Sequence, residues 1–517
     1  MPLARNVATV GTATLLSRLL GFFRDVGIAA VLGAGPFSEA FFAMLQVVNF
    51  FRRFLAEGAL NSAFVPLWLR LRSGENGAGS ADRFTKRTLV AIGCVTGIVA
   101  LLGIVFAPAV AIAIAPGFDE GRQELTTFYL FIAAPYIVLA GLVAVIAAAL
   151  NAEKRVGAVA ISTVAFNLVI LLALASALGE LDQFLTGVWL AAAIVVAGLI
   201  QLIVVAAAWL LTGNRWRRVR VRVPDQTRQL FVRVVPGLVA AGIPQLKLIA
   251  AAAIASSSPA AVSWLYYANR LYELPLGVAS VAIAVVIVPL IAASVRDGRA
   301  RDIAATQSRA FEIALGLALP AAVAFLVLAE SIAGGLFERG AFGPRDTAAV
   351  AGALAAIAAG LPGHVLEKVF GAVSFAHEDT RTPMLAALCG LAAAVAGALL
   401  LFPRYGHVGV AAAIAISAWV GAGILAVVLA RRRWLRLEGG AWQRLLRIVL
   451  ASGVMGVAIG AAQMAPLSLF GIASPGLARA VTLMALVALG FGVYLASLQI
   501  LGVARLSELS AAIRRRW

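Results

Sequence analysis

The sequence predicts an all-α polytopic membrane protein with fourteen transmembrane helices, arranged as two parallel six-helix lobes followed by two C-terminal helices. Three observations support this fold class. The 517 residues are 62% hydrophobic and 13% charged, with a mean hydropathy of +0.97, far outside the range of soluble globular chains. Apolar stretches of about 20 residues recur along the chain. Sequence landmarks also repeat at an interval of about 225 residues.

The expected spans follow from length and apolarity. A helix needs about 20 apolar residues to cross the hydrocarbon core of a bilayer. The spans are therefore expected at residues 6–32, 37–69, 88–115, 125–151, 156–179, 184–212, 229–256, 260–294, 306–336, 346–376, 382–402, 407–431, 445–465 and 476–503. With both termini in the cytoplasm, most of the 42 Lys and Arg residues lie on the cytoplasmic side, as the positive-inside rule requires. The periplasmic loops then hold Arg122, Arg339, Arg345, Arg404 and Arg479.

An internal repeat sets the expected domain organisation. Val65-Pro66-Leu67 reappears as Val288-Pro289-Leu290, and Pro135 has a counterpart in Pro362. A repeat of six spans keeps both copies in the same orientation, because six is an even number. The chain is therefore expected to divide into an N-terminal lobe at 1–222, a C-terminal lobe at 223–436, and a last part at 437–517 with two helices and a cytoplasmic tail.

Composition and motifs exclude several classes of protein. The net charge of +18 could indicate nucleic-acid binding, but the basic residues lie between hydrophobic segments, where membrane topology accounts for them. Cys94 and Cys389 are isolated within apolar runs, so neither a disulfide nor a metal site is expected. There is no GxxxxGK[ST] loop and no large soluble insertion to hold a nucleotide domain. We therefore expect a transporter rather than an enzyme, with no cofactor and no nucleic-acid partner.

The densest group of charges at membrane depth lies in residues 17–66. It consists of four arginines and three carboxylates: Arg18, Arg24, Arg52, Arg53, Asp25, Glu39 and Glu57. An arginine facing lipid at the centre of a span costs roughly 2.5–3.5 kcal/mol, so these groups are expected to face water. The polar residues of the second span form one stripe at helical spacing, namely Glu39, Gln46, Asn49, Arg53, Glu57 and Asn61.

The balance of these charges favours an anionic guest. Four arginines against three carboxylates leave a surplus of positive charge, and the arginine fork is well shaped for phosphate. The alternative is a purely structural network in which the charges pair with one another, for example Arg53 with Glu57 at a separation of four residues. Such a network needs no surplus.

The second lobe is expected to contribute to the same site, because transporters of repeated architecture bind their substrates between the repeats. The candidates are Tyr266, Asn269, Arg270 and Glu273 in the eighth span, Gln245 and Lys247 in the seventh, and His364, Glu367 and Lys368 in the tenth. His364-x-x-Glu367 resembles half of a metal motif. No second half accompanies it, so a buried polar network is preferred, and proton relay by this pair stays open.

Three stretches carry a resemblance to a known family. They are SRLLGFFRDVGIAAVLGAGPFSEAFF, NFFRRFLAEGALNSAFVP and LYYANRLYELPLGVASVAIAVVIVPL. They look like the lipid II flippase family, MurJ (also called MviN), of the multidrug, oligosaccharidyl-lipid and polysaccharide (MOP) exporter superfamily. The likeness is dense over residues 17–66 and 264–290 and, through the span count, extends over the whole chain. Family members have two lobes around a cationic cavity, and their last two helices form a hydrophobic groove for the lipid tail.

The resemblance implies a function. Such a protein translocates lipid II (undecaprenyl-pyrophosphate-MurNAc-pentapeptide-GlcNAc) from the cytoplasmic to the periplasmic leaflet of the bacterial inner membrane, for peptidoglycan assembly and cell shape. The positions that match substrate-binding residues are Arg18, Arg24, Arg52 and Arg270. The positions that match cavity or gate residues are Ser17, Asp25, Glu39, Asn49, Arg53, Glu57, Asn269 and Glu273. We expect a monomer surrounded by membrane lipids and associated with cell-wall synthesis enzymes.

The chain departs from the family pattern in three places. Glu39 stands where many members have Asp, and Asn269 stands where many have a carboxylate, which puts a gating role for an acid there in doubt. The eleventh span offers almost none of the polar ligands of the sodium site described for some members. Membrane potential and an ion gradient, including protons, therefore both remain candidate driving forces.

The expected mechanism is alternating access, in which the arginines hold the pyrophosphate and the short turn at residues 33–36 helps to seal the periplasmic side. One rival is a flippase for another undecaprenyl-linked oligosaccharide of the O-antigen type, which shares the same physical requirements. A drug/cation antiporter would need a cavity dominated by carboxylates, which the surplus of arginines argues against. A membrane scaffold for cell-wall enzymes would leave the arginines at membrane depth unexplained.

Overall fold

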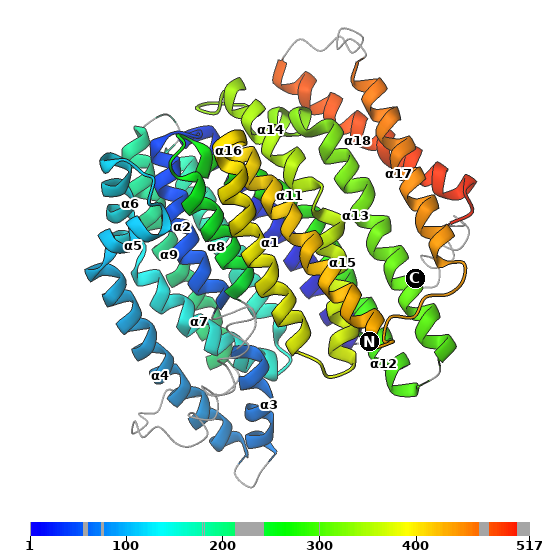
Figure 1. Ribbon diagram of the computed structural model, residues 1–517. Helices are drawn as coiled ribbons and strands as arrows, with labels where there is room; N and C mark the ends of the chain where they lie inside the picture. Colours follow the sequence, from blue (N-terminus) through cyan, green and yellow to red (C-terminus); the bar gives the residue numbers. More distant parts are fainter. Residues whose placement is uncertain are drawn as a thin grey trace. The chain divides into compact units, whose positions relative to one another are not determined.

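The structure is a computed structural model that describes residues 2–54, 60–73, 77–177, 179, 181–211, 242–298, 300–464 and 475–503. Within these residues the secondary structure is entirely helical (Figure 1). The chain forms two compact units. The first comprises Met1–Ser263 with Arg339–Phe342, and the second comprises Trp264–Glu338 with Gly343–Trp517. The first unit thus runs past residue 222, and the three-part division expected from the repeat stays a prediction.

The helices of the first unit lie where apolar spans were expected. They are α1 (Pro2–Leu32), α2 (Pro36–Phe54), α3 (Leu60–Arg72), α4 (Gly77–Val105), α5 (Ala107–Ile114), α6 (Glu120–Ala133), α7 (Pro135–Ala152), α8 (Val156–Ala177), α9 (Gln183–Leu210) and a helix at Gly242–Ala255. Within this unit α8 packs against α1 and α9, and α7 packs against α4 and α9. Asp119 and Asp182 cap α6 and α9 by accepting hydrogen bonds from backbone N–H groups of the first turn.

Two spans expected to be continuous in the first unit are divided at prolines. The span expected at 88–115 breaks at Phe106, after which α5 begins with Pro108 in its first turn. The span expected at 125–151 is divided between α6 and α7, and Pro135 opens α7. Proline lacks a backbone N–H and clashes with the preceding turn, so it suits the start of a helix rather than its interior.

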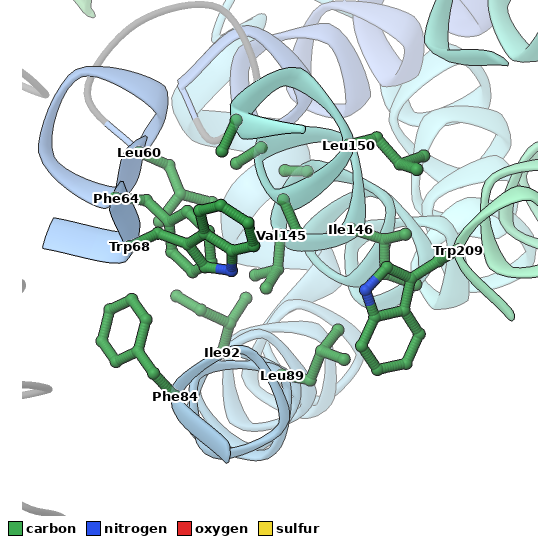
Figure 2. Packing of buried hydrophobic residues seen from close by; sticks show 14 of the residues in the cluster. Leu60, Phe64, Trp68, Phe84, Leu89, Ile92, Val145, Ile146, Leu150 and Trp209 are labelled. Carbon is green, nitrogen blue, oxygen red and sulfur yellow. The ribbon is translucent and has the colours of Figure 1, made fainter. Parts of the chain in front are cut away.

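A buried cluster ties α3 to the rest of the first unit. Figure 2 shows its side chains, which come from α3 (Leu60, Phe64, Trp68), α4 (Phe84, Leu89, Ile92), α7 (Val145, Ile146, Leu150) and α9 (Trp209). The indole of Trp68 donates a hydrogen bond to Thr85 Oγ1 at 3.1 Å, which satisfies a polar group that would otherwise be buried without a partner. The cluster fixes α3, the next described helix after the charged helix α2.

The second unit is built around the long helix α13. Its helices are α11 (Ala261–Ala282), α12 (Val288–Asp297), α13 (Ala300–Phe337), α14 (Pro344–Ala358), α15 (Leu361–Ala376), α16 (Arg381–Arg431), α17 (Ala441–Gln463) and α18 (Pro475–Ile500), with a π-helical segment, η2 (Ile283–Ile287), between α11 and α12. Helix α13 packs against α14, α15, α17 and α18. Helix α16 is interrupted at Gly406, with φ 55° and ψ −140°, between the spans expected at 382–402 and 407–431.

Ten helices among the described residues are long and apolar enough to cross a membrane. The chain is therefore a multi-pass membrane protein. Helices α1 and α2 are not among the ten, and α2 alone holds Glu39, Arg52 and Arg53. The total of fourteen crossings stays a prediction, because length and composition do not determine how charged helices are placed in a bilayer.

Candidate functional site

Arg24 is held in place by two neighbours in the first unit. Its Nη2 atom lies 2.8 Å from Asp25 Oδ1, and its Nη1 atom donates to Asn167 Oδ1 of α8 at 3.3 Å. Asp25 is fully buried, and the Arg24 side chain is 12% exposed. The amide nitrogen of Asn167 in turn donates to Ser17, at its backbone oxygen and at Oγ. Ser17, Arg24 and Asp25 thus lie together, and Asn167 links Ser17 to Arg24. Asn167 was not among the residues predicted from the sequence.

The other arginines predicted to bind substrate or line the cavity in the first unit lie on α1 and α2. Arg18 is exposed on α1, about one and two-thirds turns before Arg24. Arg52 and Arg53 are half-buried near the end of α2, and Arg52 Nε donates to Asn49 Oδ1 at 3.3 Å. Glu57, which was expected to belong to this group, lies outside the described residues.

Glu39 differs from the expectation for the polar stripe of the second span. It is 1% exposed and does not face water. Its carboxylate instead accepts a hydrogen bond from Arg122 Nη1 at 2.9 Å and another from the backbone N–H of Val262 at 3.3 Å. Arg122 also binds Asp119, where its hydrogen bond holds the pKa of that carboxyl below the usual value. From the sequence, Arg122 was expected only in a periplasmic loop, and its contact with Glu39 was not predicted. The two residues are 83 positions apart, and helical periodicity relates only residues of the same helix.

These contacts bear on the balance of charge on α1 and α2. Of the carboxylates in α1 and α2, Asp25 is bound by Arg24, and Glu39 is bound by an arginine from outside the two helices. Glu39 is therefore paired with Arg122, which also binds Asp119, and does not use one of the four arginines at residues 18–53. The surplus of positive charge on α1 and α2 is thus not compensated by Glu39.

The end of α1 makes close backbone contacts with residues 339–342, which belong to the same compact unit. The N–H of Ala341 donates to the carbonyl of Ala30 at 2.8 Å. Gly33 and Gly340 have φ angles of 62° and 61°, and a Cβ atom at either position would lie within 2.5 Å of a backbone oxygen. Only glycine fits this geometry without strain. The turn at 33–36, expected to help form a seal, is therefore part of a tight backbone junction.

We expect Gly340→Ala to loosen this junction. The added Cβ would lie 2.1 Å from the Ala30 oxygen, so the turn must move, and the left-handed backbone adds strain of about 1–2 kcal/mol. The variant should unfold at a lower temperature in detergent and lose transport. Gly35→Ala is the matched control, because a Cβ there meets nothing within 4 Å. Equal stability and transport of the two variants would contradict this account of the junction.

The second unit holds most of the remaining predicted residues. Arg270 Nη1 lies 3.2 Å from Glu273 Oε2, and Asn269 donates to the other oxygen of Glu273 at 3.4 Å, so α11 carries a compact trio. His364 of α15 shares a short hydrogen bond with the Tyr272 hydroxyl. Glu367 lies against Gly421 of α16, where a Cβ would come within 2.9 Å of its carboxylate. Gln245 and Lys247 are buried in the first unit.

A cavity of about 470 Å³ lies on the face of α2 that points away from Asn49 and Arg53. Its walls are apolar and come from α2, α4, α5, α6, α7 and helix 242–255, including Phe51, Leu102, Phe106 and Leu246. This cavity is therefore not the cationic chamber expected from the sequence. Among the described residues no group of three or more His, Cys, Asp or Glu side chains is placed to hold a metal ion.

Comparison with solved structures identifies the fold. The chain resembles the structure described as "Inward-facing conformation of a multidrug resistance MATE family transporter of the MOP superfamily", with TM-score 0.67 at 15% identity over 83% of this chain and 98% of that one. It also resembles "Lipid II flippase MurJ, inward closed conformation", with TM-score 0.76 at 22% identity over 95% of this chain and 98% of that one. The fold is thus that of MOP-superfamily transporters.

Sequence comparison narrows the class to one family. The family model "Lipid II flippase MurJ" matches residues 28–474. The "Probable lipid II flippase MurJ" of Rhizobium meliloti (strain 1021) is 38% identical over 526 residues, covering 100% of this chain and 97% of the relative. That of Vibrio cholerae is 30% identical, covering 99% and 98%. The chain belongs to the lipid II flippase MurJ family.

Proposed function

We propose that this protein is a lipid II flippase, which moves the undecaprenyl-pyrophosphate-linked peptidoglycan precursor from the cytoplasmic to the periplasmic leaflet of the bacterial inner membrane. Membership of the MurJ family supports the substrate. The observation that carries the chemistry is the surplus of arginine on α1 and α2, with Arg24 fixed by Asp25 and Asn167. A pyrophosphate supplies the negative charge and the oxygen acceptors that several guanidinium groups bind best.

We assign pyrophosphate binding to Arg18, Arg24 and Arg52 of the first unit and to Arg270 of the second. Three of these four arginines have local support. Arg24 is braced by Asp25 and Asn167, Arg52 contacts Asn49, and Arg270 lies beside Glu273. A braced guanidinium loses less conformational entropy on binding than a free one, so it binds an anion more tightly. The polyprenyl tail stays in the lipid or along α17 and α18.

Transport is proposed to proceed by alternating access. Cations brought close together in a medium of low dielectric constant repel one another, so a state that apposes the arginines forms more readily when the pyrophosphate neutralises them. Binding energy of the substrate is then what favours the conformational change. We further propose fourteen crossings with both termini in the cytoplasm, a monomer associated with cell-wall synthesis enzymes, and membrane potential or an ion gradient as the driving force.

Complementation of a strain depleted of its own lipid II flippase tests the proposal. This protein should restore growth and also restore access to lipid II at the outer face of the membrane. A flippase for O-antigen-type lipids would instead rescue a strain that lacks the O-antigen flippase and leave lipid II inaccessible. Failure of the first rescue, with the protein present in the membrane at the level of a working flippase, would overturn the proposal.

A further inference from the structure

The loop between α16 and α17 is fixed to the buried surface of α13 within the second unit. The amide of Gln307 donates to the backbone oxygen of Trp434 at 2.9 Å and accepts from the N–H of Arg436 at 2.8 Å. Ser308 Oγ accepts from the N–H of Glu438 at 2.9 Å. Gln307 and Ser308 are 0% and 1% exposed. Buried hydrogen bonds of this kind hold the backbone in one conformation, because breaking them would leave polar groups without partners.

Aromatic contacts fix the same loop from its other side. The ring of Trp434 stacks on His377, with centroids 4.2 Å apart and planes 11° from parallel. The Arg432 guanidinium lies 4.8 Å from the centre of the Trp434 ring and also pairs with Asp379. Arg433 has a φ angle of 58°, in the left-handed region, which residues other than glycine rarely adopt. The surrounding contacts therefore impose a strained conformation on this residue.

The charges displayed by the loop are predominantly positive. Asp379 is bound by Arg432, and Arg444 binds both Glu438 and Glu312. Arg431, Arg433 and Arg436 are exposed, and none of them has a carboxylate partner in the part of the chain that the structure describes. Glu378, on the neighbouring loop, is an exposed acid that offsets part of this charge. The positive-inside rule depends on the number of basic residues in a loop and not on their conformation. A run of arginine that only set the orientation in the membrane would not need the loop backbone to be fixed.

The helix that follows the loop indicates where these arginines lie relative to the membrane. Trp442, Leu446 and Leu450 are 66%, 46% and 59% exposed and recur every four residues along one face of α17. A large apolar stripe exposed on a spanning helix faces lipid, and tryptophan is enriched where a helix meets the headgroups. The stripe begins within a few residues of Arg436, so the arginines of the loop lie at headgroup level.

We propose that the loop Arg431–Arg436 is a binding platform for the phosphate of an anionic phospholipid headgroup, with the acyl chains lying along Trp442 and Leu446 of α17. Arginine forks bind phosphate oxygens in pairs, and basic clusters beside a spanning helix favour anionic lipids. The adjacent apolar stripe selects a lipid over a soluble phosphate, because only a lipid satisfies both surfaces at once. This site is independent of the proposed transport of lipid II.

Native mass spectrometry of the full-length protein in mild detergent, with equal amounts of phosphatidylglycerol and phosphatidylcholine, tests the proposal. The wild type should retain phosphatidylglycerol in preference. The double variant Arg433→Gly, Arg436→Gln should lose that preference, by about fivefold for each arginine removed. Glycine at 433 keeps the left-handed backbone, so the loop should keep its fold. Arg404→Gln, an exposed arginine at the break of α16, is the matched control and should behave as the wild type.

Three outcomes would overturn the proposal. Equal retention of the two lipids by the wild type would show that the platform does not select lipids by headgroup charge. An unchanged preference in the double variant would place the lipid elsewhere. Displacement of phosphatidylglycerol by excess inorganic phosphate, with both lipids retained equally afterwards, would indicate a site for free phosphate rather than for lipid. Selective retention that falls only in the double variant supports the platform.

Discussion

Arg52→Ala should reduce lipid II translocation to background while leaving insertion into the membrane intact. Arg52 is half-buried on α2 and contacts Asn49, so its guanidinium is positioned without being sealed inside the protein. Hydrogen bonds to charged groups contribute about 1.5–3 kcal/mol, which corresponds to a loss of at least tenfold in binding the pyrophosphate. The measurement is translocation of lipid II by purified protein in liposomes.

Two controls make the Arg52 result interpretable. Arg52→Lys keeps the charge but loses the planar fork, so it should retain part of the activity. Arg404→Ala removes an exposed arginine outside the proposed site and should transport at the wild-type rate. If Arg52→Ala and the wild type translocated lipid II equally well, pyrophosphate binding by this residue would be refuted.

Arg122→Ala should produce the largest loss of stability. It would leave the Glu39 carboxylate 1% exposed without its cationic partner, and breaking a buried ion pair in this way costs about 3–5 kcal/mol. The thermal unfolding temperature in detergent is the readout. Arg345→Ala is the matched control, because this arginine is exposed on α14 and its loss should change little.

A second variant distinguishes the cost of an unpaired buried carboxylate from the cost of lost packing around Arg122. Glu39→Gln in the Arg122→Ala background removes the orphaned charge but keeps an oxygen that can accept the hydrogen bond from Val262. The double variant should therefore be more stable than Arg122→Ala alone. If it were less stable, the cost would arise from lost packing around Arg122 rather than from an unpaired carboxylate.

Much of the fold could be predicted from the sequence, because long apolar segments report directly on spanning helices. Helices α8 and α9 lie within a few residues of the expected spans, and α16 breaks at Gly406, between two of them. The breaks at Phe106 and Pro135 were not anticipated. Apolar composition continues through them, so hydropathy alone does not mark the point where proline ends the hydrogen-bond ladder.

The sequence indicated which polar side chains share a helix, but not which side chains of other helices they contact. Helical periodicity placed Glu39, Asn49 and Arg53 on one stripe, and it located the arginines of α1 and α2. It could not show that Asn167 would hold Arg24, or that Arg122 would bury Glu39, because those partners are far apart in the chain. A single polar residue inside an apolar span, such as Asn167, is the signal that could have found the first of these contacts.

The π-helical segment Ile283–Ile287 divides the long helix that contains Arg270 into two halves, α11 and α12. A π-helical turn holds one residue more than an α-helical turn. The side chains of α12 therefore do not continue the helical periodicity of α11. A twist of the half that holds Arg270 and Glu273 can therefore be absorbed locally, while Ile291 and Ser294 keep their buried positions in α12. The half of the helix to which we assign pyrophosphate binding is in this sense separated from its buried anchor in α12.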